Sequence, residues 1–286
     1  MKVDMHCHTA EGSVDGKITM EQYIEKLKER GFGGMLVTDH DTYGGYQYYM
    51  DHIKGKKHQD FVVFKGMEYD TADYGHIIVI MPEDTAVRVL ELRGLKLKKL
   101  IKIVHYYGGI LGPAHPCGEP FMSFYNTKFR LRLEKHNILK QFDFIEVYNA
   151  CEPQKSNSSA KRLARVYQKP GLGGSDAHSI GCAGMGYTVI PDYIKTESSL
   201  IEYIKATPRI MYGGNRYHFT TKDKLGKWHK GLVVSFYVYN KTAAFFRLPQ
   251  RVKELNKIAL EMSRNKSYAD YQMQEKEKLC KKASGL

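Results

Sequence analysis

Lys-Val-Asp-Met-His-Cys-His-Thr, residues 2–9, is a short apolar run that ends in two closely spaced histidines. Side chains two positions apart on an extended strand project from the same face of that strand. His6 and His8 could therefore share one cation. Because a metal site needs further ligands, this motif predicts that other strands end beside the first one.

Two later motifs repeat this arrangement. Residues 173–178 read Gly-Gly-Ser-Asp-Ala-His, which again places two ligand types, Asp176 and His178, two positions apart. Residues 39–41 read Asp-His-Asp, and there only His40 needs to point inward. Three such groups in one chain are improbable by chance and predict a multinuclear metal site.

Short runs rich in Val, Ile and Phe alternate with helical patterns along the body of the chain. The predicted strands are 2–6, 34–39, 61–66, 75–81, 110–114, 142–148 and 172–175. The first helix is expected to begin after Thr19, an N-cap with Gln22 three positions on, and to stop at Gly31. Further helices are predicted at 95–106, 128–140, 158–167 and 200–205. Repeated strand–helix units indicate an α/β protein with a parallel sheet or barrel, whose functional groups gather where the strands end.

The candidate metal ligands all lie at or near these predicted strand ends. They are His6, His8, Asp15, His40, Glu68, His76, His115, Asp176 and His178. The set contains imidazoles and carboxylates but no thiolate, which favours Mn, Fe or Zn over a cysteine-rich structural zinc site. Glu68 follows an apolar strand, and its two carboxylate oxygens could bridge two cations.

Composition is typical of a globular enzyme. The chain has 286 residues, 42% of them hydrophobic, which is enough for one large core and matches the length of many α/β barrels. The five cysteines are scattered and the N-terminus carries no apolar signal segment, so we expect a reducing, cytoplasmic setting. The longest apolar stretch, 232–248, is interrupted by polar and charged residues, so no membrane span is expected.

Positive charge is concentrated in the last quarter of the chain. Residues 1–215 carry 28 Lys and Arg against 25 Asp and Glu, a net of +3, whereas residues 216–286 carry 16 against 6, a net of +10. The boundary predicts a main domain at 1–215 and a basic C-terminal extension at 216–286. This extension could dock on the body as a cap, with a strand expected at 232–239 and a helix after it, or could bind nucleic acid through counterion release.

The ordered motifs resemble the polymerase and histidinol phosphatase (PHP) superfamily of metal-dependent phosphoesterases over about residues 1–215. The motifs that carry the resemblance are Asp-Met-His-Cys-His-Thr, Val-Thr-Asp-His-Asp-Thr, Gly-Met-Glu, Gly-His-Ile-Ile, Pro-Ala-His-Pro and Gly-Ser-Asp-Ala-His. The resemblance implies a distorted seven-stranded (β/α)7 barrel with two or three divalent metal ions. The histidinol phosphatase branch tends to have His in place of Asp15 and a longer barrel, and this departure counts against histidinol phosphate as the substrate.

The family pattern also implies how the ligands are shared. It assigns His6, His8, Glu68 and Asp176 to one metal, makes Glu68 a bridge to a second metal held by His76 and His115, and gives Asp15, His40 and His178 to a third. The implied chemistry is hydrolysis of a phosphate ester by metal-activated hydroxide, without a protein nucleophile.

The expected substrate is a nucleotide, a short oligonucleotide or another small phosphorylated metabolite. His40, Asp176 and His178 are the candidates for passing a proton to the leaving group. Two alternatives stay open: a nuclease or nucleic-acid-binding protein that uses the basic extension, and a histidinol-phosphate phosphatase.

Overall fold

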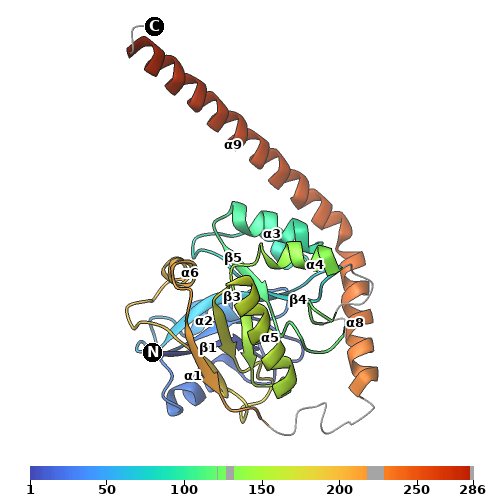
Figure 1. The fold of residues 1–286 in the computed structure, drawn as a ribbon. Coiled ribbons are helices and arrows are strands. Elements are labelled where there is room, and N and C mark those ends of the chain that lie inside the picture. The colour runs from blue at the N-terminus through green and yellow to red at the C-terminus, as the bar shows by residue number, and fades with distance from the viewer. Residues whose placement is uncertain (121, 127–131, 218–228, 284–286) are drawn as a thin grey trace.

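A curled seven-stranded sheet forms the body of the protein. The computed structural model describes residues 1–120, 122–126, 132–217 and 229–283 (Figure 1). The strands of this sheet are β1 (Lys2–Cys7), β2 (Gly34–Val37), β3 (Val62–Asp70), β4 (His76–Ile80), β5 (Ile110–Pro113), β8 (Gly186–Val189) and β9 (Met211–Gly214). They lie in the order β5-β4-β3-β2-β1-β8-β9, with β1, β2 and β3 parallel and with β4, β8 and β9 antiparallel to their neighbours.

A two-stranded parallel ribbon of β6 (Ile145–Asn149) and β7 (Gly171–Gly174) lies between β5 and β1. The amide of Asp143 donates to the carbonyl of Leu111 on one side, and the amide of Asp176 donates to the carbonyl of His6 on the other. The ribbon therefore spans the two arms of the sheet, which curls into a half-barrel.

The sequence prediction of the fold is confirmed in part, because the expected barrel is a half-barrel sheet with a separate two-stranded ribbon. All seven predicted strands are present with small shifts at their ends, and the fold is α/β. A purely parallel order is not observed, because β4 runs antiparallel. The strands β8 and β9 were missed, since each has only four residues and β9 ends in two glycines, so neither shows an apolar run.

The helices cover the curled sheet. They are α1 (Met20–Glu29), α2 (Gly44–His52), α3 (Leu97–Tyr106), α4 (Arg132–Leu139), α5 (Gln154–Tyr167) and α6 (Glu197–Ala206), with a short 3-10 turn, η1 (Arg88–Glu91). The capping box predicted at α1 is confirmed, because the Thr19 side chain accepts from the Gln22 amide and the Gln22 side chain accepts from the Thr19 amide. The helix predicted at 128–140 corresponds to α4, and residues 128–131 lie outside the described part.

One end of the half-barrel is closed by an apolar core. Val3, Leu36, Phe64, Ile78 and other buried strand residues pack in one cluster with Leu200, Ile201 and Ile204 of α6. Because this end is filled, polar groups can converge only toward the other end. The sequence-predicted ligands lie there.

The C-terminal extension is helical where the structure describes it, so the strand expected at 232–239 is wrong. Residues 229–246 form α8 (His229–Phe246), and a long helix, α9 (Leu248–Ala283), follows and points away from the sheet (Figure 1). The valine-rich run at 232–239 has the composition of a strand. The residues that follow it within α8, Asn240, Lys241 and Ala244, face the body at helical spacing. Among the described residues no helix is both long enough and apolar enough to cross a membrane.

Candidate metal centre

Six strands bring the candidate ligands to one end of the half-barrel. His6 lies in β1 with His8 just beyond it, Glu68 lies near the end of β3, and His115 follows β5. His40 follows β2, and Asp176 and His178 follow β7. His76 is the first residue of β4 rather than the last, but β4 runs antiparallel, so its start lies at the same end.

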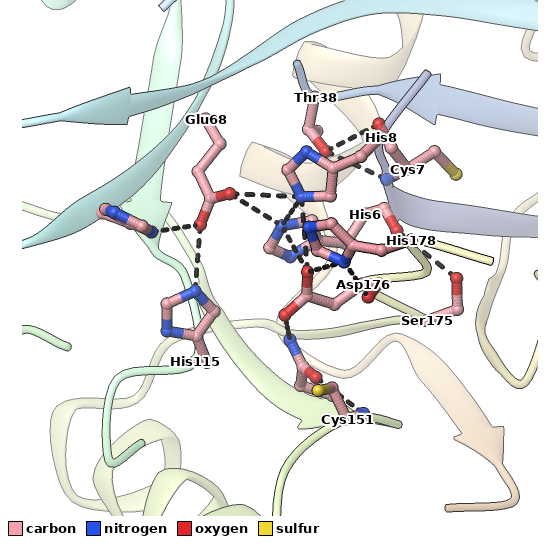
Figure 2. Close-up of polar contacts among 12 residues, drawn as sticks. His6, Cys7, His8, Thr38, Glu68, His115, Cys151, Ser175, Asp176 and His178 are labelled. Atoms are coloured by element: carbon pink, nitrogen blue, oxygen red, sulfur yellow. Dashed lines mark hydrogen bonds and ion pairs between the residues drawn. The ribbon is translucent and has the colours of Figure 1, made fainter. Parts of the chain in front are cut away.

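The Glu68 carboxylate lies at the centre of the cluster and is 1% exposed. Its Oε2 atom is 3.2 Å from Nε2 of His6 and 3.2 Å from Nε2 of His8. Its Oε1 atom is 3.0 Å from Nδ1 of His76 and 2.9 Å from Nε2 of His115. Figure 2 shows His6 and His8 on one side of the carboxylate and His115 on the other. Each oxygen of Glu68 therefore faces a different pair of nitrogen donors.

Asp176 completes the group around the first oxygen. Its Oδ1 atom lies 3.3 Å from Nε2 of His8 and 3.7 Å from Nε2 of His6. The imidazoles of His6 and His8 thus lie close to two carboxylates: Glu68, from β3, and Asp176, which follows β7. These four side chains come from three segments that are far apart in the sequence.

A third group lies nearer to the surface. Oδ2 of Asp15 is 3.2 Å from Nε2 of His178 and 3.5 Å from Nε2 of His40, while Nδ1 of His40 is 3.4 Å from Oε2 of Glu68. The Oδ1 atom of Asp15 is buried and has no hydrogen-bond partner among the described residues. A buried carboxylate oxygen of this kind is chemically suited to bind a cation.

The spacing of these donors fits bound cations. Two ligands of one tetrahedral ion, each at about 2.1 Å from it, lie roughly 3.4 Å apart. The contacts of His6 and His8 with Glu68 and Asp176 range from 3.2 to 3.7 Å. Three sets of the predicted ligands have ligand atoms within 4.8 Å of one another: His8, Asp15, His40 and His178; His6, His8 and Glu68; His40, Glu68 and His76. The structure thus brings all the sequence-predicted ligands together.

Glu146 is an important residue of the site whose role the sequence did not reveal. It is 2% exposed, and its Oε1 atom lies 2.8 Å from Nδ1 of His6. Nδ1 of His6 can donate to this carboxylate, and the contact directs Nε2 toward the cluster as a ligand atom. Oε2 of Glu146 accepts from the amide of His115 and from Nδ2 of Asn149, which also donates to Asp176.

Two serines also contact the ring nitrogens that face away from Glu68. Oγ of Ser13 is 3.2 Å from Nδ1 of His8, and Oγ of Ser123 is 3.4 Å from Nδ1 of His115. The sequence carried only weak signals for these partners, because Glu146 lies near the end of a predicted strand and the serines lie in predicted loops.

Burial and mutual charge set the ionisation of the cluster. Burial alone would raise the pKa of Glu68, but the charges of His76, His6 and His40 hold that pKa well below its usual value. Burial likewise disfavours charge on His8, yet its hydrogen bonds with Asp176 and Glu68 raise the pKa of His8 to about 10. The carboxylates therefore stay ionised, and a cation that binds here would replace protons on the imidazoles.

The backbone is unusual at three points around the cluster. Asp41, His115 and Asp176 have φ angles of 54°, 28° and 54°, in the left-handed region that non-glycine residues seldom occupy. Each is a predicted ligand or the residue after one. Strained backbone of this kind is concentrated at functional sites.

Comparison with known proteins identifies two family models along the chain. Residues 4–151 match the model described as PHP domain, and residues 154–207 match the model described as PHP-associated. The first match covers 148 of the 286 residues, more than half of the chain. No protein matches in the comparison with curated proteins.

Solved structures share the fold. PsfC from Pseudomonas syringae has a TM-score of 0.55 at 18% identity, with 84% of this chain and 98% of that chain covered. A protein from Bifidobacterium adolescentis described as a metal-dependent phosphoesterase has a TM-score of 0.51 at 16% identity, with coverage of 63% and 88%. Endonuclease Q, solved with a 27-mer duplex that carries an abasic lesion at the active site, has a TM-score of 0.53 at 19% identity, with coverage of 72% and 56%.

Proposed function

Because this chain belongs to the PHP domain family, we propose that it is a metal-dependent phosphoesterase that hydrolyses a phosphate ester of a small phosphorylated molecule. A nucleotide or short oligonucleotide is the first choice of substrate. The observation that carries the proposal is the position of Glu68, whose two oxygens each face two imidazoles. A carboxylate in this position is suited to bridge two cations.

We assign the ligands in three groups. His6, His8, Glu68 and Asp176 would hold the first ion; Glu68, His76 and His115 the second; Asp15, His40 and His178 the third. The distances within each group support the assignment, and the donor types suit Mn, Fe or Zn. Divalent ions bound there would make a coordinated water more acidic and would neutralise phosphate oxygens.

The chain's own candidates for passing a proton to the leaving alkoxide are His40, Asp176 and His178. Their side chains are 10%, 11% and 35% exposed, respectively. A substrate that enters from solvent would meet His178 first, and His178 could pass a proton only while its Nε2 atom is not bound to the third ion. Its Nδ1 atom lies 3.0 Å from the carbonyl oxygen of Asp176, which can fix the orientation of the ring.

A substrate panel tests the proposed function. The purified protein would be stripped with a chelator, reloaded with Mn²⁺, Fe²⁺ or Zn²⁺, and assayed with nucleoside monophosphates, histidinol phosphate, dinucleotides and short single-stranded and duplex oligonucleotides. We expect hydrolysis that chelation abolishes and that one of these metals restores. Asp60→Asn, which changes an exposed carboxylate, serves as the control and should behave like the unaltered protein. Hydrolysis that persists after chelation would contradict the proposal.

A nuclease is the second candidate, and the net charge of +10 on residues 216–286 favours it. Endonuclease Q, which shares the fold, was solved with lesion-bearing DNA. We propose residues 1–215 as the phosphoesterase domain and residues 216–286 as an extension that would contribute phosphate contacts if the substrate is polyanionic. The scattered cysteines support a cytoplasmic setting. Preferential cleavage of the oligonucleotides in the panel would select the nuclease.

A further inference from the structure

We propose that the C-terminal helices position His40, and do so through a buried polar chain that runs from Asn240 of α8 through Arg93 to Asp41. The inference rests on the proposed function only in that His40 is taken as a metal ligand. It gives the extension a defined part in the site, although α8 and α9 lie outside both family matches.

The first link joins Arg93 to the residue after His40. Nε of Arg93 forms an ion pair with Oδ2 of Asp41 at 3.1 Å, and the two side chains are 8% and 1% exposed. This contact is an ion pair and not a hydrogen bond. Oδ1 of Asp41 accepts from the amide of Asp70 at 2.9 Å. Asp41 is thus held from two sides in its left-handed conformation.

The second link joins Arg93 to the extension. Nη1 of Arg93 donates to Oδ1 of Asn240, and Asn240 is 3% exposed on the inner face of α8. Arg251 of α9 donates to the carbonyl of Arg93, and the ring of Tyr239 lies 5.5 Å from the Arg93 guanidinium. These partners come from residues about 150 positions along the chain from Arg93.

Gly94 shows how closely the extension fits this region. Its φ angle is +92°, and a Cβ atom built there would lie 2.7 Å from Cβ of Ala244 and 2.9 Å from Nη1 of Arg251. Lys241 adds a further contact, since its Nζ donates to the carbonyl of Thr71 at 2.9 Å. The backbone before β4, at Thr71, and the backbone after β4, at Gly94, therefore both lie against α8, and the extension is part of the packed body here.

The chain of contacts reaches His40 through the backbone. The amide of Asp41 donates to the carbonyl of Glu68 at 3.0 Å, and His40 pairs with Glu68 in an isolated parallel bridge. If Arg93 lost Asn240, the buried Nη1 group of its guanidinium would lack this acceptor, which is costly enough to favour rearrangement of the side chain. Movement of Arg93 would release Asp41 and, with it, the loop that carries His40.

Asn240→Ala and Asn240→Asp test the proposal as a pair in the full-length protein. Asn240→Ala removes the acceptor for Arg93, whereas Asn240→Asp keeps an oxygen in its place. Partners of metal ligands typically change metal affinity by 10–100-fold when they are removed. We expect Asn240→Ala to weaken the most weakly bound Mn²⁺ or Zn²⁺ ion by roughly ten-fold in equilibrium dialysis, and Asn240→Asp to retain the affinity.

Thr242→Ala is the matched control, because Thr242 lies on the exposed face of the same helix. It should change neither metal affinity nor melting temperature. Unchanged affinity for every ion in a folded Asn240→Ala variant would overturn the proposal. The double variant His40→Ala/Asn240→Ala should bind metal no more weakly than His40→Ala alone, since both changes act on the same ligand.

A second measurement separates this inference from the proposed function. In the metal-free protein, carbethoxylation of His40 can be followed by peptide mass spectrometry without any substrate or ion. His40 should react faster in Asn240→Ala than in Asn240→Asp, Thr242→Ala or the unaltered protein. Equal reactivity in all four would overturn the inference, whatever the assays of hydrolysis show. A protein that hydrolyses no ester but shows the difference in reactivity would overturn only the proposed function.

Discussion

At the scale of single residues, the site depends on one carboxylate and on the groups that orient its neighbours. Glu68 contacts His6, His8, His76 and His115 at 2.9–3.2 Å, and His40 at 3.4 Å. Glu146 contacts Nδ1 of His6, the ring nitrogen on the side away from Glu68, and so orients this ring. The candidate ligands thus surround the two oxygens of Glu68, and buried partners such as Glu146 hold their rings in place.

Glu68→Ala should remove more than one metal equivalent, because both of its oxygens face ligands of proposed ions. His40→Ala should mainly empty the third position, since its contacts with Asp15 define that group. Elemental analysis of the purified variants measures both effects. Full metal content in a folded Glu68→Ala protein would contradict the shared-ligand assignment, and Asp60→Asn is the control.

Cys117→Ser should leave turnover nearly intact. Burial, with a further contribution from Glu152, raises the pKa of the Cys117 thiol to about 12, so the reactive thiolate is scarce at neutral pH. Cys7→Ser should also retain activity, although placing a hydroxyl at this fully buried position should lower stability by about 1–3 kcal/mol. Initial rates and thermal melting check both variants. A phosphorylated enzyme trapped during turnover would argue against direct attack by water.

At the scale of elements, the β3–β4 hairpin explains how His76 reaches the cluster. The two strands are antiparallel, with Asp70 opposite His76, so the start of β4 lies beside the end of β3. Gly75 precedes β4 with a φ of +72°, and a Cβ atom there would lie 2.5 Å from the carbonyl of Met122. The amide of His76 donates to that same carbonyl. The turn therefore places His76 against the loop that follows His115.

Gly75→Ala should lower the affinity for the second ion, because the added methyl strains the turn and pushes on Met122. Gly31→Ala is a matched control: its φ is +74°, but nothing lies within 4 Å of the added Cβ atom. Both variants should lose about 1 kcal/mol of stability through the left-handed backbone. Only Gly75→Ala should bind metal more weakly, as measured by competition with a chromogenic chelator. Equal metal affinity in the two variants would contradict this account of the hairpin.

At the scale of the whole molecule, the extension combines a packed part with a projecting part. Asn240, Arg251 and Ile258 are buried against the body, whereas α9 continues well beyond it (Figure 1). Lys253 and Arg264 are exposed on α9. A prediction about nucleic acid should therefore be tested by changing exposed charges, because removal of α8 would also disturb the core.

Lys253→Gln/Arg264→Gln should flatten the salt dependence of oligonucleotide binding if the extension contacts phosphates. Each lost contact should reduce the slope of log affinity against log salt by roughly 0.7–0.9. Lys54→Gln, an exposed lysine in the turn after α2, is the control and should leave the slope unchanged. Fluorescence anisotropy at several salt concentrations provides the measurement. An unchanged slope in the double variant would remove the role of these two residues in nucleic-acid binding.

Local patterns in the sequence determined the elements and the identity of the candidate ligands. The spacing of His6 and His8, the strand runs and the Thr19 capping box depend on residues within a few positions of one another, so they can be recognised without the fold. Reliance on local patterns also explains why a strand was wrongly predicted at 232–239. The 232–239 run has strand-like composition, but it belongs to a helix whose next residues, Asn240 and Lys241, pack against Arg93 and Thr71.

Tertiary structure alone decided which ligands meet and what supports them. Glu68 and His115 are 47 positions apart, His6 and Glu146 are 140 apart, and Arg93 and Asn240 are 147 apart. No periodicity links such residues, because their contacts arise from the curl of the sheet and from the crossing of helices over it. The sequence by itself therefore determined which side chains are candidate metal ligands, while the fold decided which of them face Glu68 and how the C-terminal helices reach, through Arg93, the residue after His40.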